Sequence, residues 1–206
     1  MEALLRYLRQ TYQPLSILVY GSYANGTNGP ASDFDALVIT REGREFHDTS
    51  VVDGIRLDVF VYPERCFQGE YDCENFFQIF DGILPEDPLG LGKQLQDRVL
   101  EAIASRPRTT REDIRSDLDW CEKMLERTGR GDGEGYFRWH WLLTESLEIF
   151  CDVVDQCYFG PKKTLNWMRD AHPEAFRLYL QALENFTRES LLNWIHYLTA
   201  LEIAVP

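Results

Sequence analysis

The stretch GSYANGTNGPASDFD, residues 21–35, decides how the rest of the chain can be interpreted. A short apolar run, ILVY at residues 17–20, precedes it, and a second run, ALVI at residues 36–39, follows it. Apolar runs of this length on both sides of a connection rich in Gly, Asn and Ser are typical of two strands joined by a turn. The sequence therefore predicts strand, polar connection, strand over this region.

Two carboxylates stand where the second predicted strand begins. Asp33 and Asp35 are separated by one residue, and alternate strand residues point to the same side, so both acids share a side that Phe34 does not. Two like charges this close repel each other unless a cation compensates them. Oxygen-only ligands suit Mg²⁺, so we predict a magnesium site here. The alternative is an acidic turn between two strands.

Gly21 and Ser22 end the first predicted strand and form the second candidate feature, an anion-binding turn. Gly21 can adopt backbone angles that other residues avoid. A short helix that begins there presents free N–H groups and a positive dipole end to an anion, and the Ser22 hydroxyl adds a donor. A phosphate cradle beside paired carboxylates predicts a nucleoside triphosphate bound with Mg²⁺.

These residues resemble a known signature. Gly-Ser, ten residues, then Asp-x-Asp is similar to the motif of the nucleotidyltransferase superfamily that includes DNA polymerase β. The short spacing, with Gly26 inside and Ser32 directly before Asp33, resembles the minimal and antibiotic nucleotidyltransferases. The resemblance implies transfer of a nucleoside monophosphate from a triphosphate, with two Mg²⁺ ions held by carboxylates.

A third carboxylate, Asp58, lies in the next β-rich segment, SVVDGIRLDVFVY. Asp53-Gly54 is a strong two-residue hairpin signal, and Asp58 falls in the middle of the strand that follows it. Such a residue can simply be an exposed position on a half-buried sheet. The resemblance instead implies that Asp58 holds the metal that activates the acceptor and serves as a base.

The remaining pattern predicts an α+β protein with two domains. Residues 1–90 are expected to form a nucleotidyltransferase core, a mixed β-sheet with flanking helices, that ends in a breaker-rich loop at residues 81–90. Residues 91–206 change to helical periodicity and predict an α-helical bundle. The expected helices span residues 2–11, 93–105, 111–127, 136–157, 164–171, 173–186 and 189–204.

Lys162 and Lys163 are candidates for binding the triphosphate. They stand at the start of a predicted helix, where a cation gains nothing from the helix dipole. An outside partner would explain that placement, and two solvated surface lysines are the alternative. The helical domains of antibiotic nucleotidyltransferases imply the first reading, because they reach back over the triphosphate.

Glu145 and Glu148 are candidates for binding the acceptor. They lie three residues apart, hence on one face of a predicted helix that is otherwise largely apolar. Buried carboxylates are costly, so the pair needs a reason, either a cationic acceptor or a role as base. A polar stripe that faces water is the alternative.

Composition limits the partners. The net charge is −13, and residues 1–90 hold 6 Lys and Arg against 15 Asp and Glu, which disfavours a nucleic-acid acceptor. No apolar run approaches the ~20 residues that span a bilayer, and no signal peptide is evident, so we expect a cytoplasmic protein without a membrane partner. The five cysteines include no Cys-x-x-Cys pair, which disfavours zinc.

The sequence thus predicts a Mg²⁺-dependent nucleotidyltransferase that transfers AMP from ATP, the co-substrate, to an acceptor hydroxyl and releases pyrophosphate. A small molecule such as an aminoglycoside or lincosamide antibiotic is the first acceptor class, which would make the activity one of antibiotic resistance. An antitoxin-type enzyme that modifies a partner protein is the second. A binding module that keeps ATP affinity without turnover is the third.

Overall fold

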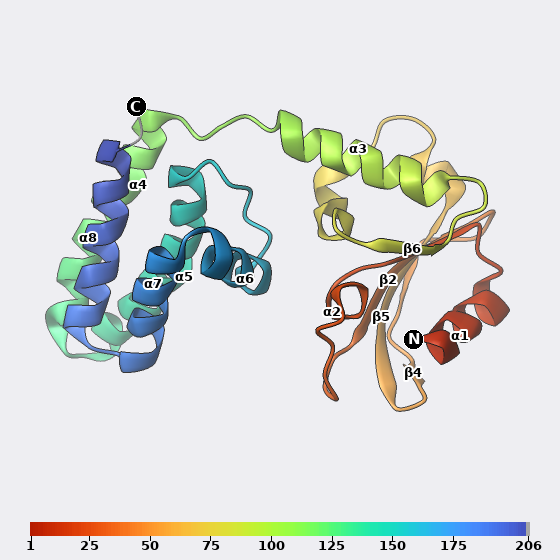
Figure 1. Ribbon diagram of the computed structural model, residues 1–206, viewed down its shortest axis with the longest axis horizontal. Helices are drawn as coiled ribbons and strands as arrows, with labels where there is room; N and C mark the ends of the chain where they lie inside the picture. The colour runs from red at the N-terminus through yellow and green to blue at the C-terminus, as the bar shows by residue number, and fades with distance from the viewer. Residues whose placement is uncertain (205–206) are drawn as a thin grey trace. The chain divides into compact units, whose positions relative to one another are not determined.

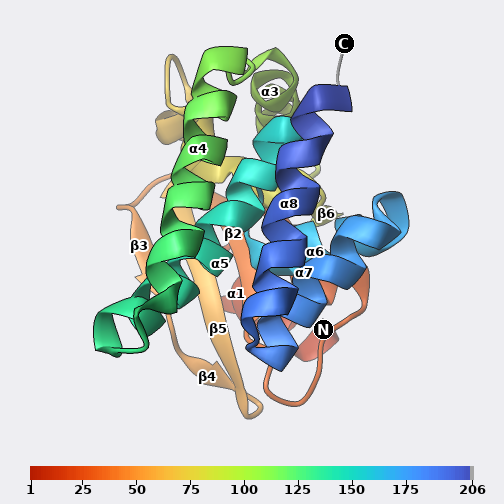
Figure 2. The same ribbon diagram turned by 90° about the vertical axis from the view of Figure 1, so that its left-hand side faces the viewer.

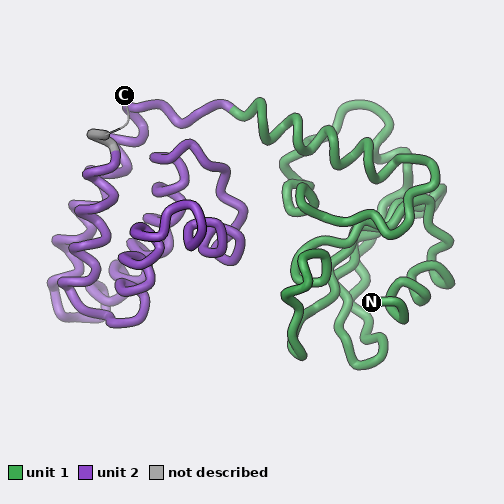
Figure 3. The backbone as a smooth tube through the Cα atoms, viewed as in Figure 1, with its two compact units in different colours: residues 1–106 green, residues 107–206 purple. Residues whose placement is uncertain are grey.

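The computed structural model describes residues 1–204, which form two compact units divided after residue 106 (Figure 3). The division falls further along the chain than the predicted boundary at residue 90. The helix α3 (Leu91–Ser105) accounts for the difference. Its buried residues Leu95 and Val99 pack against Leu18 of the sheet, so α3 belongs to the first unit.

The first unit is built on a mixed sheet of six strands in the order β3-β5-β2-β1-β6, with β4 paired to β5 (Figure 1). The strands β2 and β5 are parallel and the other pairs are antiparallel. The strands are β1 (Ser16–Val19), β2 (Phe34–Thr40), β3 (Phe46–Asp48), β4 (Val51–Val52), β5 (Ile55–Pro63) and β6 (Ile83–Glu86). The helical segments are α1 (Glu2–Tyr12), α2 (Ser22–Asn25), α3 and the 3₁₀ helices η1 (Glu64–Phe67) and η2 (Cys73–Ile79).

Alternation along the strands gives the sheet two covered faces. Ile17 and Val19 join the cluster that α1 covers through Leu4, Leu5 and Leu8. The intervening Leu18 belongs to the opposite cluster, together with residues of η2 and α3. Because strand side chains point alternately to the two sides, these clusters lie on opposite faces of one sheet. The predicted mixed sheet with flanking helices is confirmed.

The loop expected at residues 81–90 contains a strand. β6 pairs antiparallel with β1, with Val19 opposite Ile83 and Ile17 opposite Glu86. The breakers that predicted a loop are compatible with this strand because β6 lies at the edge of the sheet, the position at which proline is tolerated in strands. Gly82, just before the strand, passes so close to Leu18 that a Cβ there would collide with it.

The hairpin predicted at Asp53-Gly54 is confirmed. It joins β4 to β5, and both turn residues have positive φ, 50° at Asp53 and 80° at Gly54. Two successive positive φ angles are the requirement of the two-residue hairpin turn that matches strand twist. This turn fixes where β5 begins, and with it the position of Asp58 along the sheet.

A buried carboxylate fastens the short strand β3 to α1. Asp48 is 6% exposed and accepts hydrogen bonds from the hydroxyls of Tyr12 (2.5 Å) and Tyr7 (3.3 Å) and from the backbone N–H of Ser50 (2.9 Å). Burial by itself would raise the pKa of Asp48. The hydrogen bonds from Ser50, Tyr12 and Tyr7 outweigh burial and lower that pKa.

We expect Tyr12→Phe to lower the free energy of unfolding by about 1–2 kcal/mol at pH 7, because it removes a hydrogen bond to a charged group. A lowered pKa means that this stabilisation is present above the unfolded pKa of roughly 3.9 and is lost as pH falls through the folded pKa. Urea titrations of the wild type and the variant should therefore converge in acid. A difference that stays constant down to pH 2 would contradict the assignment.

The second unit is an array of helices around one core (Figure 2). α4 packs against α5 and α8, and α7 packs against α6 and α8. Its helices are α4 (Arg111–Arg127), η3 (Thr128–Arg130), α5 (Gly133–Val153), α6 (Pro161–Ala171), α7 (Pro173–Asn185) and α8 (Arg188–Ala204). The prediction that the C-terminal part of the chain forms an α-helical domain is thus confirmed.

Two hydrogen bonds fix the centre of this core. The indole N–H of Trp194 donates to Ser146 Oγ at 2.9 Å, and the Tyr179 hydroxyl donates to the carbonyl of Leu143 at 2.8 Å. Both acceptors lie on α5, the helix predicted to be central. None of the helices within residues 1–204 combines the length and the apolar character needed to cross a membrane.

Candidate active site

Asp35 and Asp58 lie side by side on the two parallel strands. In the register of β2 and β5, Asp35 is the partner of Asp58, and registered residues of parallel strands point to the same face. Both side chains are partly exposed, on the side of the sheet that carries Leu37 and Phe60 at the next alternate positions. The structure thus brings together two of the three predicted carboxylates.

Asp33 lies just before β2 rather than inside it, and it is exposed. Phe34, the residue between the acids, is fully buried in the cluster under α1 and packs edge-on against Tyr23, with ring centroids 5.2 Å apart. That anchor fixes the point at which the polar connection enters the sheet. Asp33 therefore lies immediately before the first residue of β2, two residues from Asp35.

Gly21 brings the Gly-Ser turn into contact with Asp35 of the Asp-x-Asp motif. Its backbone (φ 66°, ψ −146°) lies in a region essentially restricted to glycine, and α2 begins at the next residue, Ser22. A Cβ on Gly21 would collide with Oδ2 of Asp35 and lie 3.1 Å from its Cγ. The carboxylate of Asp35 therefore packs directly against the Gly-Ser turn. Ser22 itself is buried, with 4% of its surface exposed.

Tyr20 is a neighbour of the acids that the sequence analysis did not identify. It follows β1 and is 7% exposed. Burial raises the pKa of its hydroxyl strongly, and the charges of Asp58 and Asp35 raise it further, while a hydrogen bond with Gln78 acts in the opposite direction. Tyr20 therefore stays neutral at the physiological pH and adds a polar hydroxyl beside the carboxylates without adding charge.

His47, on the edge strand β3, is a second residue that the sequence analysis missed. Its Nε2 lies 2.5 Å from Oδ1 of Asp58. Its ring is stacked on Phe60, with centroids 4.3 Å apart and planes 2° from parallel. A strand of three residues is too short to show alternation. The local sequence signal is a histidine between the apolar Phe46 and the acid Asp48.

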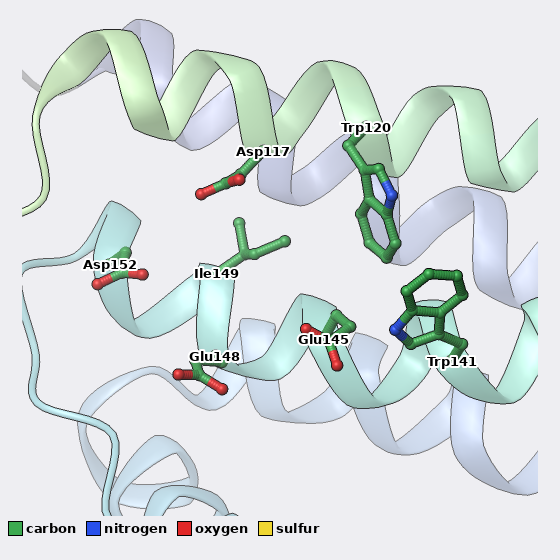
Figure 4. A pocket seen from close by; sticks show the side chains of 7 residues that line it. All are labelled: Asp117, Trp120, Trp141, Glu145, Glu148, Ile149 and Asp152. Atoms are coloured by element: carbon green, nitrogen blue, oxygen red, sulfur yellow. The ribbon is translucent and has the colours of Figure 1, made fainter.

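The remaining predicted site residues belong to the second unit. Lys162 and Lys163 lie in the first turn of α6. Glu145 and Glu148 lie on α5 and line an open cavity of about 320 Å³ (Figure 4). The seven lining residues are four acids, two tryptophans and one isoleucine: Asp117, Trp120, Trp141, Glu145, Glu148, Ile149 and Asp152.

The cavity concentrates negative charge against an aromatic wall. The rings of Trp120 and Trp141 meet edge to face with centroids 5.4 Å apart. Burial raises the pKa of Glu148, and the carboxylates of Glu145 and Asp152 raise it further. Burial likewise raises the pKa of Asp117, with Asp152 as the next contributor. Glu148 and Asp117 therefore resist ionisation, and a bound cation would stabilise their charged forms.

Comparison with known proteins identifies the family. Residues 1–104 match the family model of the nucleotidyltransferase domain, and the chain therefore belongs to that family. No curated protein matches the chain. Among solved structures it is similar to a nucleotidyltransferase-like protein from Exiguobacterium sibiricum 255-15, with 13% identity and a TM-score of 0.44, over 98% of this chain and 75% of that one. Family membership confirms the class predicted from residues 21–35 and makes the chain a nucleotidyl-transferring protein in general.

The family implies a nucleotide and a divalent cation, and the carboxylates on β2 and β5 fit such a cation. Asp35 and Asp58 offer carboxylate oxygens side by side, which is the ligand type that Mg²⁺ prefers. Within residues 1–204, no group of three His, Cys, Asp or Glu side chains is placed to hold a metal. Mg²⁺ usually takes one or two protein carboxylates and completes its shell with water and substrate phosphates.

Proposed function

We propose that this chain transfers AMP from ATP to a hydroxyl group of a small, cationic acceptor and releases pyrophosphate. The observation that carries the proposal is the cluster on the parallel strands β2 and β5, in which Asp35 lies beside Asp58 and packs against Gly21. Paired acids beside a Gly-Ser turn provide what nucleotidyl transfer needs, namely charge for a cation and backbone close enough to receive phosphate.

In this proposal the acids differ in their roles. Asp35 and Asp58 would hold Mg²⁺, with Asp33, two residues before Asp35, as a further candidate ligand, and the bound ion would neutralise charge that develops on the phosphates. Asp58 accepts the proton of the acceptor hydroxyl, whose oxygen then bonds to the α-phosphorus. The bond from the α-phosphorus to the bridging oxygen breaks, and pyrophosphate leaves with the electron pair. Gly21 and Ser22 receive the triphosphate. Binding of triphosphate charge by Lys162 or Lys163 stays a prediction from the sequence.

The acidic cavity on α4 and α5 supports a cationic acceptor. Its volume of about 320 Å³ lies at the lower end of the range for small-molecule sites, and its walls combine carboxylates with the Trp120–Trp141 pair. Carboxylates attract ammonium groups, and indole faces add cation–π attraction. An aminoglycoside-like compound, which carries several amines and several hydroxyls, matches both this cavity and the proposed chemistry.

The direct test measures two products, the acceptor that receives the labelled nucleotide and the pyrophosphate that is released. ATP labelled at the α-phosphate is incubated with Mg²⁺, the protein and a panel of acceptors that includes aminoglycosides and lincosamides. We expect one pyrophosphate per labelled small-molecule product. Label on a co-expressed protein would shift the acceptor class to protein. Nucleotide binding without transfer to any acceptor would leave a regulatory module, and no nucleotide binding would refute the proposal.

The role of the cavity gives a separate prediction. Glu145→Gln together with Glu148→Gln should raise the KM for a cationic acceptor roughly tenfold, the loss expected for a hydrogen bond to a charged group. The KM for ATP should not change. Glu126→Gln, an exposed α4 residue that does not line the cavity, is the control. Equal KM values for the acceptor in all three proteins would remove the cavity from the acceptor site.

A further inference from the structure

The strand β3 brings His47 to Asp58 by a fixed register. In the antiparallel pairing of β3 with β5, His47 lies opposite Phe60, and Asp58 is two residues before Phe60 on the same face. The imidazole lies flat on the Phe60 ring, 4.3 Å between centroids and 2° between planes. Its Nε2 reaches Oδ1 of Asp58 at 2.5 Å. Stacking and hydrogen bond together fix both the plane and the direction of the ring.

The strand that carries His47 is itself held in place. The next residue, Asp48, is buried on the other side of β3 and bonded to Tyr12, Tyr7 and the N–H of Ser50. Successive residues of a strand point to opposite sides, so Asp48 secures the backbone while His47 faces Asp58. An edge strand of three residues would otherwise have little to keep it in register.

The contact has a consequence for Asp58. A partly exposed carboxylate, 41% exposed here, rotates freely unless a donor holds one oxygen. Oδ1 is committed to His47, so Oδ2 is the oxygen available to a cation or to a proton. An N–H directed at Asp58 also offsets part of the repulsion between Asp58 and Asp35, its registered neighbour.

We propose that His47 is a positioning residue for Asp58. The Nε2–H donates to Oδ1, orients the carboxylate and presents Oδ2 to the ligands of the site. This inference rests on the proposed nucleotidyl transfer and deepens it. Partners of this kind, which hydrogen-bond a metal-binding group without touching the metal, typically change affinity or activity by roughly 10–100-fold when they are removed.

Two variants separate the hydrogen bond from the stacking. His47→Phe keeps an aromatic ring on Phe60 and removes the donor. His47→Gln loses the ring but supplies an amide N–H with similar reach. His196→Phe, an exposed position on α8, is the matched control for the same chemical change. Thermal unfolding of all three variants shows whether each is folded under the assay conditions.

The readouts are calorimetric binding of Mg²⁺ with a non-hydrolysable ATP analogue, and kcat and KM for transfer. We expect His47→Phe to lower kcat or magnesium-assisted nucleotide affinity by ~10–100-fold with little change in the KM for the acceptor. His47→Gln should recover at least part of the loss, and His196→Phe should match the wild type. Recovery by Gln would not follow from a purely structural role of the ring.

Three outcomes would overturn the inference. A folded His47→Phe with wild-type binding and kcat would remove His47 from the site while leaving the proposed function intact. A folded His47→Gln as impaired as His47→Phe would assign the effect to ring packing rather than to the hydrogen bond. A wild-type protein without magnesium-assisted nucleotide uptake would refute the proposed function, and the positioning role with it.

Discussion

Replacing Asp35 with Asn is expected to lower nucleotidyl transfer by more than ~100-fold, beyond the loss that removal of an outer-shell partner causes. Asp35 lies next to both parts of the proposed site, since Asp58 is its registered neighbour and the Gly-Ser turn lies against its carboxylate. Asparagine keeps the shape of the side chain but removes the charge. The expected defect is therefore chemical, and kcat should report it.

The fold should tolerate this change. Asp35 is partly exposed beside another acid, so removing its charge relieves repulsion rather than breaking the core. We expect thermal unfolding at or above the wild-type temperature. The matched control is Asp53→Asn, the same chemical change in the exposed turn that starts β5, where Asn also accepts a positive φ. Wild-type turnover by a folded Asp35→Asn protein would refute the metal assignment.

Several features of the site are determined by residues that are close together in the sequence. The Gly-Ser turn, the Asp-x-Asp start of β2 and the Asp53-Gly54 hairpin are set by neighbouring residues, and alternation alone places Phe34 opposite the acids. These features could be read from the sequence. The side-by-side arrangement of Asp35 and Asp58 is different in kind, because it depends on the parallel pairing of β2 with β5, two strands separated by β3 and β4.

The features that sequence reasoning missed depend on tertiary contacts. Pro85 predicts a loop by local rules, and only the edge position of β6 makes a strand acceptable there. The helical pattern of α3 shows that one side is apolar but not which unit that side packs against. His47 becomes notable only when β3 is paired with β5. The contact of Lys162 or Lys163 with phosphate stays a prediction for the same reason.

Gly21→Ala is the second change with a large expected effect, and it acts in two ways. The backbone at φ 66° and ψ −146° should cost about 1–3 kcal/mol of folding free energy for any residue with a side chain. The new Cβ would also collide with Oδ2 of Asp35. That oxygen ends a flexible side chain, so the carboxylate can move aside, away from its place beside Asp58. We therefore expect a modest loss of stability together with a loss of transfer that approaches that of Asp35→Asn.

A second glycine separates these two effects. Gly26 also has a positive φ, 73°, but a Cβ there would meet no atom within 4 Å. Gly26→Ala should therefore show a comparable loss in urea titrations, about 1–2 kcal/mol, with transfer close to the wild-type rate. Equal losses of activity in the two variants would mean that strain in the turn, rather than displacement of Asp35, disables the site. Loss of transfer confined to Gly21→Ala would tie the conformation of the glycine turn to the carboxylate that the chemistry requires.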